Sequence, residues 1–246
     1  MDETVSTVGL VGATPGDLPD PLCEADLTLH EIEPGSSGAH EALDLVFAVG
    51  TEPLLAALRD APGVPVVPVA AGRGVPSIDA RGLSDAVEDL VAGRWETETH
   101  PILDVAVDGE SATRAAADVT LVTEQPAQIS EYAVRSGGER VARFRADGVV
   151  LATPVGSAGY ARRVGGPILA PGTGLVAAPV APFATDPDHW VLGPDEVRVR
   201  VERDEAPVVL LADDRTVGPV DTTTPVSVSV ADRATLAVLS GAGDRW

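Results

Sequence analysis

Apolar positions in the first hundred residues form short continuous runs, separated by segments in which apolar residues recur three and four positions apart. The continuous runs predict buried strands at residues 5–12, 43–49 and 64–70. The periodic segments predict helices at residues 54–59 and 85–92. Because strands and helices alternate at this spacing, residues 1–95 are predicted to form a small parallel α/β domain.

Individual residues refine this prediction. The prolines within 64–70 predict a position at an edge or exit of the sheet, because proline cannot donate a hydrogen bond to a neighbouring strand. Ser84 is expected to cap the second helix, and Gly93 is expected to end it.

The carboxyl ends of the predicted strands carry the first candidate ligand residues. Gly50, Thr51 and Glu52 follow the second strand, and the glycine-containing residues 72–74 follow the third. Parallel sheets bind ligands at these strand ends, so the two loops are the expected site of the first domain.

After Trp95 the apolar positions alternate with polar ones, which is typical of strands with one buried face. Asp108-Gly109 predicts a tight hairpin turn. The predicted strands are residues 102–107, 119–122, 132–134, 141–144, 149–151, 197–201, 208–211 and 226–230. The sequence therefore predicts an all-β domain over residues 96–240 and a tail at 241–246, which makes the whole an α+β protein of two domains.

The net charge is strongly negative, because the sequence contains 38 acidic residues and only 17 basic ones. It contains no lysine, so all 17 basic residues are arginines. The acidic residues are dispersed among the apolar segments. This composition resembles that of halophilic, archaeal proteins, in which high salt screens the self-repulsion of an acidic surface. A net charge of −21 also argues against a nucleic-acid partner.

The hydrophobic segments also bear on the location of the protein. No apolar run approaches the roughly 20 residues of a membrane span, so we expect no membrane partner. The N-terminus has no basic stretch before its first apolar run, which argues against a signal peptide. The single Cys23 excludes an internal disulfide framework, and we expect a reducing cytoplasm.

A glycine-rich segment at 147–171 (DGVVLATPVGSAGYARRVGGPILAP) carries the most chemistry. A buried strand at 149–151 runs into a turn that contains proline, four glycines, Ser157 and Tyr160. Glycines let a ligand approach the main chain, and exposed N–H groups suit a polyphosphate or a ribose. The alternative interpretation is a β-hairpin with glycine-rich turns.

The order of residues in this segment resembles a known motif. Residues 153–160 (TPVGSAGY) followed by 165–168 (GGPI) resemble the TPTGSTAY…GGPI signature of the NAD kinase family, and Asp147-Gly148 stands where that family has its DG. The resemblance implies an N-terminal α/β domain and a C-terminal β domain. It also implies ATP-dependent phosphorylation of NAD to NADP with Mg²⁺, and a cytoplasmic homodimer or homotetramer.

The resemblance further implies which residues contact the nucleotides. In the glycine-rich segment these are Asp147, Thr153, Gly156, Ser157 and Tyr160.

Two other family motifs are altered. Where the family has GGDGT before Leu-Leu, this chain has residues 49–53 (VGTEP), so that Gly50 remains and Thr51 stands at the position of the catalytic Asp. A threonine hydroxyl cannot accept a proton near neutral pH, so Glu52 or Asp147 would have to act as acid/base. Where the family has Asn-Glu, this chain has Ala117-Asp118, in which Asp118 retains a carboxylate for the ribose.

Three hypotheses remain open. The first is a working NAD kinase, and the second is a catalytically inactive dinucleotide-binding paralogue with a regulatory role. The third is a related kinase that acts on another substrate. The four histidines lack metal-ligand spacing, so no protein metal site is predicted.

Overall fold

The computed structural model describes residues 5–12, 27–33, 42–60, 63–79, 81–125, 128–193, 195–204, 206–213 and 215–243. Cys23, Asp214 and the last three residues of the predicted tail lie outside these ranges. The chain forms two compact units, the first made of 1–100 with 233–246 and the second of 101–232.

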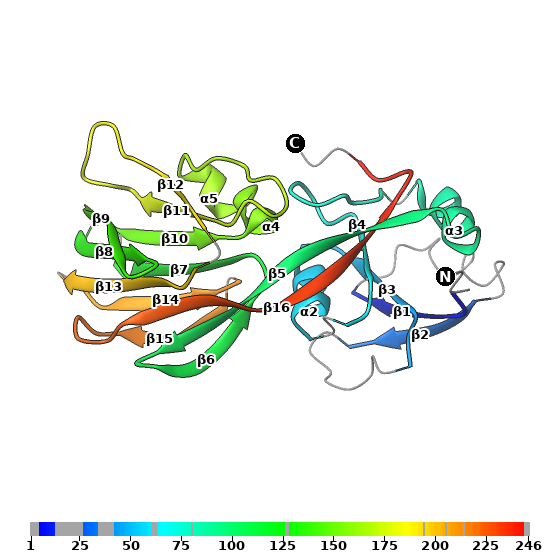
Figure 1. Ribbon diagram of the computed structural model, residues 1–246, viewed down its shortest axis with the longest axis horizontal. Helices are drawn as coiled ribbons and strands as arrows, with labels where there is room; N and C mark the ends of the chain where they lie inside the picture. Colours follow the sequence, from blue (N-terminus) through cyan, green and yellow to red (C-terminus); the bar gives the residue numbers. More distant parts are fainter. Residues whose placement is uncertain are drawn as a thin grey trace. The chain divides into compact units, whose positions relative to one another are not determined.

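The first unit is an α/β structure, as predicted (Figure 1). Its elements are β1 (Thr7–Val11), β2 (Thr28–Ile32), β3 (Leu45–Val49), α2 (Thr51–Asp60), β4 (Val66–Val69), α3 (Leu83–Val91), the start of β5 (Trp95–Val107) and the end of β16 (Val226–Leu239). Strands β2, β1, β3 and β4 pair in parallel in this order. The edge strand β2 was not predicted, because its residues are mostly exposed and lack an apolar run.

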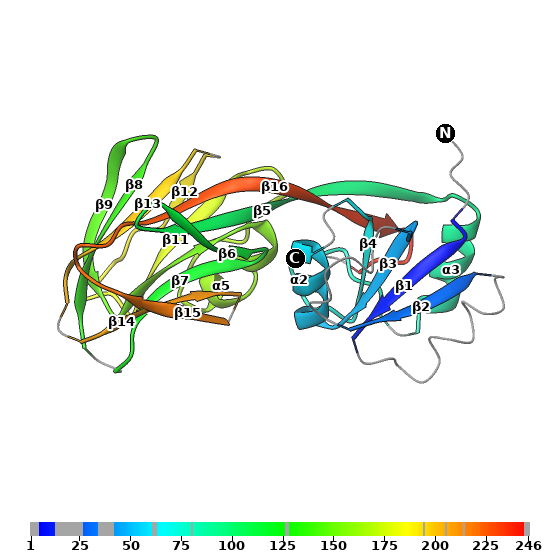
Figure 2. The same cartoon turned by 90° about the horizontal axis from the view of Figure 1, so that it is seen from below.

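Helices cover both faces of these parallel strands. α3 packs its Leu83, Val87 and Leu90 against the face that carries Leu45 and Phe47. α2 lies on the other face (Figure 2), where its Leu54 and Leu58 are buried. All five residues of β3 are therefore buried, which explains its continuous apolar run.

The structure corrects two of the sequence predictions in this unit. β4 is not an edge strand, since it lies between β3 and β16. Proline is tolerated because Pro68 faces away from β3: its carbonyl accepts the N–H of Ile78 at 2.9 Å, on the side where β16 pairs with β4 only at Val66. α3 begins at Leu83 after Gly82, so Ser84 is not its cap.

The predicted end of α3 is confirmed. The helix ends at Val91, and Gly93 follows with φ +67, a left-handed conformation that favours glycine.

The second unit is built of two β-sheets packed face to face, as Figure 1 shows. One sheet contains the end of β5, β6 (Glu110–Ala115), β8 (Ser130–Ser136), β9 (Glu139–Ala146), β13 (Val197–Arg203) and the start of β16. The other contains β7 (Asp118–Thr123), β10 (Gly148–Ala152), β11 (Leu175–Val180), β12 (Trp190–Leu192), β14 (Val208–Ala212) and β15 (Arg215–Val220). Two single-turn helices, α4 (Pro154–Ser157) and α5 (Tyr160–Arg163), follow β10.

The core of this unit lies between the two sheets. Alternate residues of β13 (Val197, Val199 and Val201) point into it, while the arginines between them are exposed. The predicted hairpin turn at Asp108-Gly109 is confirmed, with φ of +52 and +83 joining β5 to β6. The two architectures thus follow from two apolar patterns: continuous apolar runs in the α/β unit and alternating apolar residues in the β unit.

The units do not divide the chain where the predicted domains do. β5 and β16 each contribute residues to both units, and residues 233–243 belong to the first unit rather than to the β-rich one. The apolar alternation of β16 continues through this boundary, so the sequence gives no local signal for it.

Candidate functional site

The glycine-rich segment leaves the interior of a sheet. β10 lies between β7 and β11, and all five of its residues are buried. The chain then turns at Thr153 into α4 and α5. The chain does return to pair antiparallel with β10, as β11. The connection is not the glycine-rich turn of the alternative interpretation, because residues 154–157 and 160–163 are helical.

Thr153 fixes the turn between β10 and α4. It caps α4, since its Oγ1 accepts the N–H of Gly156 at 3.3 Å. The same hydroxyl lies 2.7 Å from the carbonyl of Ala116 and 3.0 Å from that of Ala117, to which it donates. Thr153 is fully buried, so its hydroxyl makes its hydrogen bonds inside the protein. Pro154 then occupies the first helical position, which its fixed φ favours.

Gly156 and Ser157 lock α4 in place. A Cβ at Gly156 would lie 2.1 Å from the carbonyl oxygen of Ala117, so only glycine allows this approach of α4 to β7. The Ser157 hydroxyl donates to the carbonyl of Pro154 at 2.7 Å and accepts the N–H of Leu169 at 2.9 Å. Ser157 thereby ties the GGPI loop to α4, and both residues act on the backbone of the turn.

Asp213 is a site residue that the sequence analysis did not identify. It lies in the turn between β14 and β15 with φ +49 and is largely buried. Its carboxylate accepts the backbone N–H groups of Ala116 at 2.9 Å, Ala117 at 2.7 Å and Asp118 at 3.2 Å. The available signal was an aspartate just after the predicted strand at 208–211, a position that is equally typical of an ordinary turn. Asp tolerates the left-handed conformation that this turn requires.

The three acidic and phenolic candidates of this unit interact electrostatically. The pKa of Tyr160 is raised, first by burial and then by the charges of Asp118 and Asp147, while Arg163 opposes the shift. The phenol is therefore protonated at neutral pH and available as a hydrogen-bond donor. Asp118 is largely buried at the start of β7, where Thr120 Oγ1 donates to its carboxylate at 3.3 Å.

Asp147 precedes β10, and its backbone is held on both sides. Its N–H donates to Val180 at 2.9 Å, and its carbonyl accepts the Tyr132 hydroxyl at 3.2 Å. Burial raises the pKa of Tyr132, and the Asp147 charge adds to that shift. The Asp147 side chain is half-buried.

The remaining candidates belong to the first unit. Gly50 follows β3 with φ +94, a conformation that favours glycine, and its carbonyl accepts the N–H of Leu54 at 3.2 Å. α2 starts at the next residue, so a helix N-terminus faces the carboxyl end of a parallel sheet. This arrangement suits an anion, because the first N–H groups of a helix have no partners within it.

The side chains of Thr51 and Glu52 differ in their hydrogen bonding. The Thr51 hydroxyl donates to the carbonyl of Ala71 at 3.0 Å and so joins the loops after β3 and β4. Glu52 is exposed in the first turn of α2 and makes no side-chain hydrogen bond or ion pair within the described residues. Of the two, Glu52 has the carboxylate that is chemically able to accept a proton.

Two features of the described part of the chain bear on metals and membranes. Among these residues no group of three or more His, Cys, Asp or Glu side chains is arranged to hold a metal ion. None of the helices in the same ranges is long and apolar enough to cross a bilayer.

Comparisons with known proteins agree on one family. Residues 116–240 match the ATP-NAD kinase C-terminal domain family. The NAD kinase of Methanospirillum hungatei is 28% identical over 224 residues, which cover 87% of this chain and 80% of that protein. The NAD kinase of Methanosarcina barkeri is 33% identical over 131 residues, which cover 52% of this chain. The chain thus matches only about half, 47%, of the M. barkeri protein.

Solved structures share the fold. An NAD kinase from Archaeoglobus fulgidus, crystallised with ATP, superimposes with a TM-score of 0.76 at 22% identity, covering 94% of this chain and 92% of that one. Yeast NADH kinase complexed with NADH gives the same TM-score at 15% identity, covering 97% of this chain and 85% of that one. By the match of half its length to the family domain, the chain belongs to the NAD kinase family.

Proposed function

We propose that this protein is an NAD kinase that transfers the γ-phosphoryl group of ATP to the 2′-hydroxyl of the adenosine ribose of NAD. The observation that carries the proposal is the Thr153–Tyr160 turn, which lies in the domain that matches the family. Buried hydrogen bonds from Thr153 and Ser157 hold its backbone, and Asp213 holds residues 116–118, against which the turn packs. A turn fixed in this way presents its main chain to a ligand without reorganisation.

In this proposal the buried hydroxyls of the turn position it, and the less buried groups around it bind. Thr153, Gly156 and Ser157 hold the backbone of α4. Tyr160 and Asp118 contact the ribose hydroxyls of the dinucleotide. Tyr160 donates from its protonated phenol, whose raised pKa keeps it neutral, and Asp118 accepts.

The first unit would bind the phosphates and supply the base. Gly50 and the N-terminus of α2 bind phosphate oxygens through backbone N–H groups. Glu52 accepts the proton of the ribose hydroxyl as the phosphoryl group is transferred, and Asp147 is the second candidate for this role. General base catalysis contributes about 10²–10⁴-fold to such a reaction.

Mg²⁺ is expected to accompany the phosphates of ATP. This ion keeps several waters and is commonly held by one or two carboxylates together with substrate phosphates. The ATP phosphates and water would supply most of its ligands here, because the Glu52 carboxylate is assigned to the base and would not also coordinate the ion. The ion would neutralise charge on the transferred group.

The test is formation of NADP from NAD and ATP with Mg²⁺ in molar KCl. We expect turnover by the wild type and a loss of about 10²–10⁴-fold in kcat for Glu52→Gln. Glu88→Gln is the matched control, because Glu88 is exposed on α3 and its substitution removes the same charge. Full activity of Glu52→Gln would move the base to Asp147, which Asp147→Asn then tests.

A second variant separates a kinase from a binding paralogue. Thr51→Asp with Glu52→Gly and Pro53→Thr changes residues 49–53 to VGDGT, which matches the family motif GGDGT at four of its five positions. If the wild type binds NAD without turnover and only this triple variant makes NADP, the protein is the inactive dinucleotide-binding paralogue. Absence of dinucleotide binding by every variant would remove both hypotheses.

The acidic composition supports a setting for this activity. We propose a halophilic, archaeal protein that works in a cytoplasm of high salt, as a homodimer or homotetramer. Light scattering coupled to size-exclusion chromatography in 0.1 M and 3 M KCl measures the assembly. A monomer at both KCl concentrations would exclude the proposed homodimer or homotetramer.

A further inference from the structure

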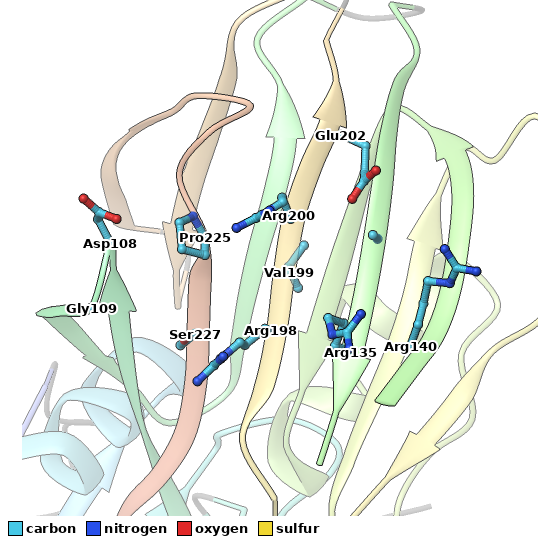
Figure 3. Close-up of a pocket in the computed structure, with 11 residues that line it drawn as sticks. Asp108, Gly109, Arg135, Arg140, Arg198, Val199, Arg200, Glu202, Pro225 and Ser227 are labelled. Carbon is cyan, nitrogen blue, oxygen red and sulfur yellow. The ribbon is translucent and has the colours of Figure 1, made fainter. Parts of the chain in front are cut away.

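A groove on the second unit gathers positive charge on a very acidic protein. It has a volume of about 550 Å³ and lies on the outer face of the sheet that contains β16, β13, β8 and β9. Figure 3 shows arginine side chains from three of these strands along it. The four arginines that line the groove are Arg135, Arg140, Arg198 and Arg200.

The strand register places three of these arginines in one row. Arg198 of β13 is directly opposite Arg135 of β8, and Arg135 is opposite Arg140 of β9. Because neighbouring strands lie about 4.8 Å apart, the row spans roughly 10 Å. Like charges directly opposite each other destabilise a sheet. The row therefore costs stability unless an anion lies between the guanidinium groups.

Acidic partners within the protein neutralise only part of the row, since one of its three arginines, Arg198, forms an ion pair within the described residues. Arg198 pairs with Glu196, and Arg135 donates to the backbone carbonyl of Gly138. Arg140 and Arg200 make no ion pair within the described residues, although acidic residues outnumber arginines by more than two to one in this chain. The groove also contains two carboxylates, from Asp108 and Glu202, so its four arginines leave it net positive.

We propose that this groove binds the phosphate groups of a short oligophosphate, either free or as part of a nucleotide. Each guanidinium presents parallel N–H donors that match phosphate oxygens, and three of them in a row match a linear anion with several charges. The groove volume lies in the range of small-molecule sites. A long polyanion is disfavoured, because the remaining surface of a chain with net charge −21 repels it.

This site is separate from the glycine-rich segment. None of the residues that line the groove belongs to 147–171, and the arginine row lies on a different sheet from β10. The inference therefore goes beyond the proposed kinase activity. It assigns an additional anion site on the β unit, and its test needs neither NAD nor turnover.

The experiment titrates the full chain with sodium tripolyphosphate by isothermal calorimetry in 1 M KCl, followed by 3 M KCl. We expect saturable binding that weakens at the higher salt concentration. Arg135→Gln, Arg140→Gln and Arg198→Gln should each weaken binding about tenfold. Arg81→Gln is the matched control, since Arg81 is exposed in the first unit and its substitution removes the same charge. This control variant should bind tripolyphosphate with unchanged affinity.

Thermal melts without ligand keep the test independent of misfolding. Loss of one of two opposed guanidinium groups should leave the melting temperature of Arg135→Gln equal to or above that of the wild type. Adding ATP to the tripolyphosphate complex distinguishes the sources: displacement identifies the triphosphate of a nucleotide, and retention identifies a free oligophosphate. Absence of saturable binding, or equal weakening by Arg81→Gln and the groove variants, would overturn the proposal.

Discussion

Asp213 and Thr153 hold the same dipeptide from opposite sides. The Asp213 carboxylate accepts the N–H groups of Ala116 and Ala117, and the Thr153 hydroxyl donates to their carbonyls. The two residues are 60 positions apart in the sequence, yet together they fix the strand start on which α4 rests. Two alanines are thus a structural centre of the candidate site through their backbone alone.

Asp213→Ala should strongly destabilise the protein. The substitution removes the carboxylate that accepts three backbone N–H groups in a buried turn. A hydrogen bond to a charged group contributes about 1.5–3 kcal/mol to stability. We expect a decrease of about 3 kcal/mol in the free energy of unfolding, measured by denaturant titration in molar KCl. Asp213→Asn retains an acceptor oxygen and tolerates φ +49, so it should lose less.

Asp186→Ala is the control for this pair of variants. Asp186 is exposed, and surface substitutions change stability within about ±0.5 kcal/mol. If Asp213→Ala were no less stable than Asp186→Ala, the hydrogen bonds at 116–118 would not determine the turn.

Gly156→Ala tests whether the glycine serves packing or ligand approach. Because the added Cβ would meet the Ala117 carbonyl oxygen at 2.1 Å, we expect a loss of about 3 kcal/mol in the free energy of unfolding without ligand. At Gly218 nothing lies within 4 Å of an added Cβ, so Gly218→Ala should retain or slightly gain stability. A stable Gly156→Ala that no longer binds dinucleotide would instead assign the glycine to ligand approach.

The two tyrosines should titrate late. Burial and the nearby Asp147 charge raise the pKa of both Tyr132 and Tyr160 above the ordinary value of about 10. Absorbance at 295 nm should therefore show little phenolate in the native protein at pH 10 and about half ionisation after denaturation. Tyr160→Phe should remove the earlier of the two native transitions, because Tyr132 is fully buried.

The same shifts determine the sign of a stability change at high pH. Above about pH 10 the unfolded chain releases tyrosyl protons that the native protein keeps, so the free energy of unfolding falls as pH rises through this range. Well below pH 10 the tyrosines are protonated in both states, so they should contribute no pH dependence to the free energy of unfolding. Native tyrosines that ionise together at pH 10 would contradict their burial.

Salt should stabilise the fold. At 0.1 M the Debye length is about 10 Å and falls to about 3 Å at 1 M, so KCl screens the repulsion of a chain with net charge −21. We expect the melting temperature to rise by at least about 4 °C from 0.1 to 3 M KCl, which corresponds to about 1–2 kcal/mol in a chain of this size. Circular dichroism melts provide the measurement.

A control at pH 4 identifies the cause of the salt effect. Carboxylates approach their ordinary pKa there and lose charge, so the dependence on KCl should shrink. A salt effect of equal size at both pH values would attribute it to effects other than charge screening.

The sequence by itself determined many of the buried strands and the two longer helices, but not the exposed strand β2 or the short helices α4 and α5. Continuous apolar runs identified β3 and β10, and alternation identified β13, because a strand buried on both faces and a strand buried on one face have different periods. The order of residues at 153–168 identified the family, which the match over residues 116–240 bears out. Each of these signals is local, so a single stretch of chain was sufficient.

Only the tertiary structure shows which atoms the candidate side chains contact. Thr153 and Ser157 looked like ligand contacts, but their hydroxyls bond to backbone that arrives from β7 and from the loop at Leu169. The local pattern around Asp213 did not reveal its role, because its three hydrogen-bond partners lie 95 to 97 residues away. The row formed by Arg198, Arg135 and Arg140 likewise exists only once three strands pair in register. Partners and registers of this kind are set by packing between distant segments, which no local pattern encodes.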